Sequence, residues 1–260
     1  MRILFIGDIV GGPGRACVKN WLPELCGEHR IDFVVANGEN SAGGLGATPA
    51  ILRELLGCGV HAITMGNHTW RKKELAPMLD SFGTVVRPAN YPEGVPGQGS
   101  VVIRLADGRS VGVANLLGRV FMEPVGCPFT IGRREVERLR EQTRIVLVDI
   151  HAEATAEKVA LGWYLDGLCT AVVGTHTHVQ TADERILPQG TAYITDVGMT
   201  GPMDSVIGVE REKIIHKFLT GMPAEHTISK ERPGLNGVVI EADDATGRAV
   251  SIQRVTRFDA

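Results

Sequence analysis

The sequence predicts an α/β fold built around parallel strands. Short apolar runs alternate with amphipathic stretches through the first half of the chain, and polar residues gather where the apolar runs end. Repeated β-α units imply parallel strands joined by helical crossovers. The 260 residues are 43% hydrophobic, which suffices to bury a large core. We therefore expect one domain over residues 1–260.

The expected elements follow from hydrophobic periodicity and turn residues. Strands are expected at residues 2–7, 32–36, 61–64, 145–149, 171–174 and 193–195. Helices are expected at residues 15–26, 49–56, 71–79 and 154–165. Two hairpins are expected, one from residues 101–105 with 110–115 and one from 234–241 with 249–255. The proline- and glycine-rich stretch 87–100 is expected to be a surface loop.

Charge and composition exclude several classes of protein. The net charge is −3 and no long basic run occurs, so stable binding of duplex nucleic acid is not expected. A single nucleotide remains open, because a metal site can supply positive charge locally. No apolar run is long enough to cross a bilayer, so no membrane association is expected. The five cysteines form no close pair, which favours reduced thiols in a cytoplasmic protein.

Polar residues follow five of the expected strands at their carboxyl ends. In chain order they are Asp8; Glu39 and Asn40; Asn67 and His68; His151; and His176 and His178. In open α/β sheets, ligands bind just beyond the carboxyl ends of parallel strands. If these strands are neighbours, all five groups converge on one crevice.

Carboxylates, amides and imidazoles together form a ligand set for divalent metals. Their number exceeds the four ligands of a structural zinc site and fits two adjacent ions that share a carboxylate. Two ions roughly 3.5–4 Å apart can clamp the attacking and leaving oxygens of a phosphoryl displacement. The pattern therefore predicts a metal-dependent phosphoesterase.

Each of the five groups also has an interpretation that involves no metal, and it is their joint occurrence that favours the metal site. Gly-Asp and Asn-Gly-Glu-Asn are common turns, whereas His-x-His is the strongest single signal, because two imidazoles on one short loop can reach neighbouring ions. The glycines after the first strand have the wrong spacing for a dinucleotide fingerprint. The remaining histidines lack companion ligands and are expected to be structural or solvent-facing: His29, His61, His216 and His226.

These blocks resemble the five-block signature of calcineurin-like metallophosphoesterases over almost the whole chain. The forms GDIVG, NGENSAGG, TMGNHTW, NLLGR, DIHAEATAEK, GTHTHVQTAD and TDVGMTGP are similar to the YmdB-like subfamily of bacterial metallophosphoesterases. That resemblance implies a metallo-dependent phosphatase-like β-sandwich flanked by helices, in α-β-β-α layers, with the C-terminal hairpin in the second sheet. It also implies hydrolysis of 2′,3′-cyclic nucleotides and related cyclic phosphodiesters.

The resemblance implies a role for each site residue. Asp8, Glu39, Asn40 and His178 would hold the first ion, and Glu39, Asn67, His151 and His176 the second, with Glu39 bridging. His68 would act as general acid while a hydroxide between the ions attacks phosphorus. Two departures from the wider superfamily stand out: the first block lacks the histidine of Asp-x-His, and the bridging acid is Glu39 instead of Asp. Asn40 is placed to replace that histidine, and its oxygen favours Fe or Mn over zinc.

Three alternatives remain open from the sequence. A phosphomonoesterase, or a phosphodiesterase for a different substrate, would share the same metal core. A regulatory protein could use the site to bind a nucleotide and act through partners, although the presence of His68 favours turnover. Apart from the question of activity, the sequence is also compatible with a homo-oligomer.

Overall fold

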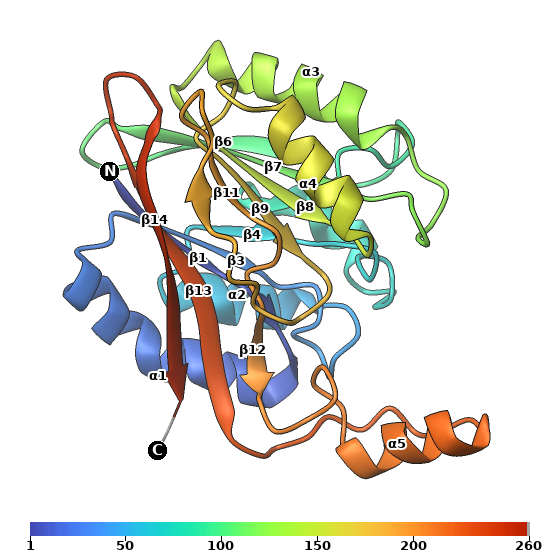
Figure 1. Ribbon diagram of the computed structural model, residues 1–260. Helices are drawn as coiled ribbons and strands as arrows, with labels where there is room; N and C mark the ends of the chain where they lie inside the picture. Colours follow the sequence, from blue (N-terminus) through green and yellow to red (C-terminus); the bar gives the residue numbers. More distant parts are fainter. Residues whose placement is uncertain (259–260) are drawn as a thin grey trace.

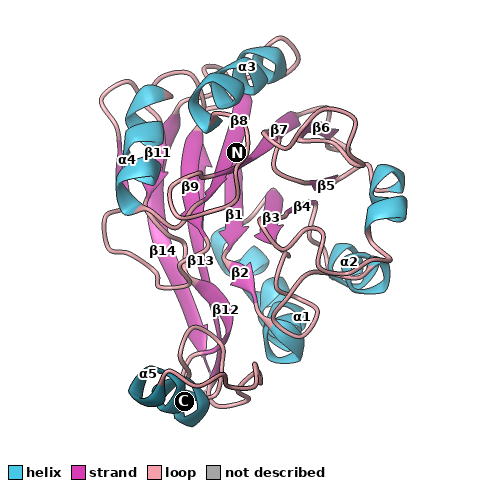
Figure 2. Cartoon of the chain, turned by 90° about the vertical axis from the view of Figure 1, so that its right-hand side faces the viewer, coloured by secondary structure: helices cyan, strands magenta, loops and turns pink. Residues whose placement is uncertain are grey.

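Two β-sheets pack face to face with helices on both outer faces, which confirms the predicted α-β-β-α layers (Figures 1 and 2). The structure is a computed structural model, and it describes residues 1–258. Within these residues, no helix combines the length and the apolar character needed to cross a membrane.

The first sheet contains the N-terminal strands and the C-terminal hairpin. Its strand order is β2 (Asp8–Ile9), β12 (Met199–Pro202), β13 (Pro233–Ala242), β1 (Arg2–Ile6), β3 (Phe33–Asn37), β4 (Ala62–Thr64) and β5 (Val85–Val86), and β14 (Ala249–Phe258) pairs with β13. β1, β3, β4 and β5 are parallel, and β13 runs antiparallel to β1. The parallel strands of this sheet therefore share one carboxyl edge.

The second sheet is formed by the middle of the chain. Its strand order is β10 (Arg185–Ile186), β11 (Ala192–Ile194), β9 (Ala171–Thr175), β8 (Ile145–His151), β7 (Ser110–Leu117) and β6 (Ser100–Arg104). β7, β8, β9 and β11 are parallel, and β6 and β7 form the predicted hairpin. Every residue of β8 and β9 is buried, as expected for central strands covered on both faces.

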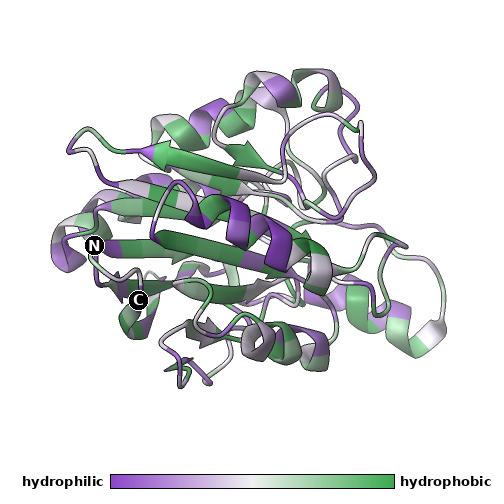
Figure 3. Cartoon of the chain, turned by 90° about the horizontal axis from the view of Figure 1, so that it is seen from above, coloured by the Kyte–Doolittle hydropathy of each residue, from purple (hydrophilic) through white to green (hydrophobic). Residues whose placement is uncertain are grey.

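The alternation of side chains along β1 explains the layering. Ile3 and Phe5 are fully buried between the two sheets, whereas Leu4 and Ile6 are fully buried on the helical side of the first sheet. Successive residues of a strand point to opposite faces, so one strand contributes to two cores. Figure 3 shows the resulting hydrophobic strands between helices whose residues are mixed in hydropathy. Burying a side chain such as Phe5 stabilises the fold by about 1.5–3 kcal/mol.

Helices close the outer faces. α1 (Gly11–His29) and α2 (Pro49–Gly57) pack on the first sheet, and α3 (Pro128–Arg140) and α4 (Thr155–Tyr164) pack on the second. α2 begins where the sequence signals it: the Thr48 hydroxyl accepts a hydrogen bond from the backbone N–H of Ile51 at 3.3 Å, and Pro49 starts the first turn. α5 (Arg211–Thr220) stands apart from the body and has no buried residue (Figure 1).

Two expectations about the fold are wrong. The helix expected at residues 71–79 is instead a series of turns followed by the 3-10 helix η1 (Ala76–Ser81). Pro77 accounts for the break, because proline cannot donate an α-helical hydrogen bond and is tolerated only in the first turn of a helix, where η1 places it. The C-terminal hairpin joins the first sheet instead of the second, since β13 pairs with β1. α3 and α5 were not predicted.

Candidate metal centre

The predicted site residues do come together, but from two sheets instead of one. Asp8, the Glu39–Asn40 pair and the Asn67–His68 pair follow strands of the first sheet, or begin one in the case of Asp8. His151 ends β8 of the second sheet, and His176 and His178 follow β9. The carboxyl edges of both sheets therefore face a common region.

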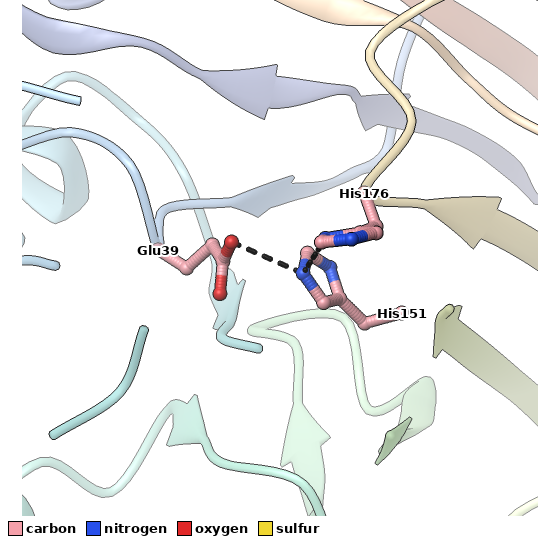
Figure 4. Close-up of side chains that lie close together, drawn as sticks. All are labelled: Glu39, His151 and His176. Carbon is pink, nitrogen blue, oxygen red and sulfur yellow. Dashed lines mark hydrogen bonds and ion pairs between the residues drawn. The ribbon is translucent and has the colours of Figure 1, made fainter. Parts of the chain in front are cut away.

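The imidazole of His151 lies at the centre of one group of side chains. Its Nε2 atom is 3.0 Å from Glu39 Oε1, 3.1 Å from Asn67 Oδ1 and 3.1 Å from His176 Nδ1. Figure 4 shows Glu39, His151 and His176 pointing toward one another from separate segments. Ligand atoms of these three residues all lie within 4.8 Å of one another, close enough to bind one metal ion together.

A second group adjoins the first through Glu39 and Asn40. The Asn40 amide nitrogen donates to Glu39 Oε1 at 3.1 Å and lies 3.2 Å from His178 Nε2. Asp8 Oδ1 lies 3.8 Å from the same His178 nitrogen. In this orientation Asn40 directs its amide nitrogen at the group, so coordination of an ion through oxygen requires rotation of the amide by half a turn.

A buried orphan atom tests whether the site suits a cation. Asp8 is fully buried, and its Oδ1 has no hydrogen-bond partner among the described residues. An unpaired buried carboxylate oxygen is costly unless a cation binds it. Asp8 therefore fits as a ligand, and the cluster as a whole suits a divalent metal ion.

The pKa shifts of the clustered residues also favour a cation at this site. Burial would raise the pKa of Glu39, but the adjacent His151 imidazole holds that pKa well below its usual range. Burial disfavours the charged form of His151, yet Glu39 raises its pKa to about 9. Burial, together with the nearby His151, lowers the pKa of His176 to about 3. The buried acids thus favour positive charge at this position, which a metal ion would supply in place of the proton on His151, and the neutral His176 keeps a nitrogen lone pair for an ion.

Each of the three clustered imidazoles has an acceptor on its outer nitrogen. His151 Nδ1 donates to the Thr175 hydroxyl at 2.9 Å, and His178 Nδ1 donates to the Ile207 carbonyl at 2.9 Å. His176 Nε2 lies 3.2 Å from the Glu153 carboxylate. An acceptor on one nitrogen fixes the tautomer and leaves the other nitrogen's lone pair for a metal. These partners were not singled out in the sequence.

Two buried acids support the loop that carries His176 and His178. Asp149 accepts the Thr175 hydroxyl at 2.7 Å, which extends the chain of hydrogen bonds from His151. Burial raises the pKa of Asp149 to about 6. Asp196 accepts from Lys158 at 2.8 Å and from the backbone N–H of Thr177 at 3.1 Å. The loop is anchored at Thr175 and Thr177, on either side of His176.

His68 contacts the cluster on one side and a pocket on the other. Its Nδ1 lies 2.7 Å from Asn40 Oδ1 and 3.2 Å from Glu39 Oε1, and its backbone N–H donates to Glu39 Oε2 at 2.9 Å. His68 also lines a pocket of about 320 Å³ that adjoins the cluster. With Nδ1 directed at the cluster, its Nε2 is the nitrogen left for a group in the pocket.

The four other histidines lie outside the cluster. His61 Nδ1 accepts the backbone N–H of Val34 at 3.0 Å, which is the structural role expected. His216 is exposed on α5, and His29 lies at the end of α1. His226 is exposed as expected but also lines the pocket beside His68, a position that the sequence did not indicate.

The layered fold and its cluster of acids, amides and imidazoles are those of a metallophosphoesterase. Residues 4–255 match the family described as YmdB-like protein. The chain is 52% identical over 255 residues to the 2′,3′-cyclic-nucleotide 2′-phosphodiesterase of Bacillus subtilis (strain 168), an alignment that covers 98% of this chain and 96% of that relative. The chain therefore belongs to the YmdB-like family.

Two crystal structures share the fold. A hypothetical protein from Thermus thermophilus is 42% identical, with a TM-score of 0.91 over 100% of both chains. A novel phosphatase from Mycoplasma pneumoniae is 37% identical, with a TM-score of 0.92 over 99% of this chain and 93% of that chain. The whole described chain thus follows the family architecture.

We predict that Gly66→Ala removes the metal-binding geometry without unfolding the protein. A Cβ atom at Gly66 would lie 2.3 Å from Glu39 Oε2 and 2.4 Å from His151 Nε2, so both side chains must move. Misplacement by about 1 Å costs roughly 10²-fold in activity. Metal analysis, circular dichroism and kinetics on the same sample measure the effect.

Gly27→Ala is the matched control, because a Cβ atom there meets nothing within 4 Å and alanine suits the interior of α1. This control should keep full metal content and activity. Normal metal content and activity in Gly66→Ala would contradict the geometry of the cluster.

Proposed function

We propose that the chain is a dinuclear metal-dependent phosphodiesterase that hydrolyses 2′,3′-cyclic nucleotides. The observation that carries the proposal is the position of Glu39, whose Oε1 contacts both groups of side chains, His151 at 3.0 Å and Asn40 at 3.1 Å. A carboxylate between two groups is the arrangement that a bridging ligand requires. The relative from Bacillus subtilis, which is named for this activity, supports the choice of substrate.

The proposed ligands divide between the two groups. Asp8, Glu39, Asn40 and His178 hold the first ion, and Glu39, Asn67, His151 and His176 hold the second. The ions supply polarisation of the phosphoryl oxygens and activation of a water molecule. The chain's own contribution is to fix the ligand nitrogens through the acceptors on their outer sides and to place His68 beside the cluster.

His68 is proposed to protonate the departing ribose oxygen. Its Nδ1 lies 3.2 Å from Glu39 Oε1, and this contact directs Nδ1 at the cluster so that Nε2 is available to the pocket. When the ring is protonated, Nε2 carries the proton that it donates to the leaving oxygen. A positioned imidazole of this kind contributes roughly 10²–10⁴-fold to the rate. A strained five-membered cyclic diester also demands less of its leaving group than a linear diester.

The remaining proposals concern the setting of the enzyme. We propose that the ions are Fe or Mn, because Asn40 and Asn67 add oxygen ligands to a set of imidazoles. We also propose a cytoplasmic location, because free thiols suit a reducing compartment, and they occur at Cys26, Cys58, Cys127 and Cys169. We further propose that residues 1–260 form a single catalytic domain. Self-association into a homo-oligomer is proposed because α5 exposes Ile215, Phe218 and Leu219.

A substrate panel with Mn- or Fe-reconstituted protein tests the proposed activity. We expect 2′,3′-cyclic nucleotides to be the best substrates, ahead of 3′,5′-cyclic nucleotides, bis-p-nitrophenyl phosphate and p-nitrophenyl phosphate. If p-nitrophenyl phosphate is hydrolysed best, the protein is a phosphomonoesterase. Binding of nucleotides without turnover of any ester would instead favour a regulatory role.

Metal analysis should separate the bridging residue from a terminal ligand. We expect about two ions per chain in the parent, a loss at both positions in Glu39→Gln, and a loss mainly at one position in Asn40→Ala, since a bridge serves two ions. Elemental analysis after reconstitution gives the stoichiometry of each variant. Two retained ions in Glu39→Gln would rule out the bridging assignment.

His68→Ala should keep both metals and the fold but lose roughly 10²–10⁴-fold in turnover of 2′,3′-cyclic nucleotides. The loss on bis-p-nitrophenyl phosphate should be much smaller, because p-nitrophenolate leaves without a proton. Steady-state kinetics on both substrates, with metal content measured on the same sample, decides the role. Equal losses on both substrates at full metal occupancy would exclude a general acid.

A further inference from the structure

The pocket beside the metal centre has a second wall that contributes none of the proposed ligands. On the near side the pocket is lined by site residues, including Asn40, His68 and His178. On the far side it is lined by Ile207, Val209, His226 and Ile228, from the two segments that flank α5. The far wall is therefore apolar except for one imidazole. A volume of about 320 Å³ lies within the range of small-molecule sites.

The two chain segments that form the far wall are hydrogen-bonded to each other. The backbone N–H of Glu210 donates to the Thr227 carbonyl, and that of Ser229 donates to the Gly208 carbonyl, both at 3.0 Å. Val209 also forms an isolated bridge with Ile228. The two segments that flank α5 thus close on each other beside the metal centre.

Gly44 allows this wall to approach the ligand-bearing loop. Its φ is +84°, and a Cβ atom there would lie 2.4 Å from Ile228 Cδ1 and 3.0 Å from His226 Cε1. A residue with a side chain at this position would push Ile228 and His226 away from the cluster. The glycine therefore keeps both residues against the pocket.

Ile207 is held in a conformation that few β-branched residues adopt. Its φ is +45°, its side chain is 52% exposed, and it lines the pocket. Such backbone strain persists only where the surrounding structure imposes it and is concentrated at functional sites. The carbonyl of Ile207 fixes the tautomer of His178, while its side chain faces the pocket.

The chemical character of the residues that line the pocket indicates which kind of ligand it can bind. None of the described lining residues is lysine or arginine, so the wall offers no site for a second phosphate. Aliphatic side chains next to one imidazole suit a flat, uncharged, largely apolar group that also carries hydrogen-bonding atoms. A nucleobase with its ribose has this character, whereas a further phosphate of an oligonucleotide does not.

We propose that this pocket is the nucleoside subsite of the enzyme, in which Ile207, Val209 and Ile228 pack against the base and His226 hydrogen-bonds to the nucleoside. The inference rests on the proposed function, because it places the phosphate of the same substrate at the metal cluster. It makes His226 and Ile228 determinants of specificity, with no part in the chemical step.

Kinetics on two cyclic diesters test the subsite with metal-reconstituted full-length protein. One substrate is 2′,3′-cyclic AMP, and the other is ethylene phosphate, which has the same five-membered ring but no nucleoside. His226→Ala and Ile228→Ala should each raise KM for 2′,3′-cyclic AMP by roughly three- to tenfold, the effect of losing one modest contact, with kcat little changed. Both variants should hydrolyse ethylene phosphate like the parent.

His216→Ala and Val250→Ala are the matched controls, because both residues are exposed, on α5 and β14, and neither lines the pocket. These controls should leave both substrates unaffected. Unchanged KM for 2′,3′-cyclic AMP in the two pocket variants would overturn the subsite. Equal losses on both diesters would overturn it as well, because they would show a distorted metal centre.

Binding of adenosine provides a readout that does not depend on turnover. Saturation-transfer NMR should show contact between the base protons and the parent protein, with weaker binding in Ile228→Ala and unchanged binding in Val250→Ala. Failure of the proposed function is distinguishable: the parent would then not hydrolyse 2′,3′-cyclic AMP, while adenosine would still bind. Absence of adenosine binding to the parent would overturn the subsite itself.

Discussion

The buried carboxylate of Glu39 is the interaction on which the rest of the site depends. It follows β3 of the first sheet, is fully buried, and contacts His151 at the end of β8 in the second sheet. A buried carboxylate is tolerated only when it is paired and hydrogen-bonded, and here His151 and the backbone N–H of His68 meet that need. The contact joins the carboxyl edges of the two sheets, so the relative position of the sheets sets the geometry of the cluster.

The second constraint is the loop after β9, which carries two imidazoles in unfavourable backbone conformations. His176 and His178 have φ values of +94° and +65°, a region that residues other than glycine rarely adopt. Strain of this kind needs compensation from the surroundings. Asp196, which is paired with the buried Lys158, accepts both the N–H and the hydroxyl of Thr177 between the two histidines. The buried ion pair therefore holds the loop in the conformation that directs both rings at the cluster.

The sequence predicted the ligand-type residues and their convergence because carboxyl ends of parallel strands share an edge. It did not predict their division between two sheets, since β3 of the first sheet and β8 of the second are both short apolar runs buried at every residue. The helix expected at residues 71–79 failed because one proline outweighed the amphipathic pattern. Asp149 and Asp196 were not singled out, because their partners Thr175 and Lys158 come from other elements and only the fold brings them together. His226 lies in a polar stretch, and only the tertiary fold brings it beside His68.

Ile207 connects the metal centre to the far wall of the pocket. Its carbonyl orients His178, and the strained backbone that presents this carbonyl also turns the side chain toward the pocket. The neighbouring Gly208 packs against Val10, where a Cβ atom would lie 2.8 Å from Val10 Cγ1, and Val10 itself follows the strand that begins with Asp8. The segment around Ile207 therefore contacts the first proposed ion's ligands both directly and through Val10. The same stretch of backbone therefore orients a proposed metal ligand and lines the pocket, which explains why the pocket lies directly beside the metal centre.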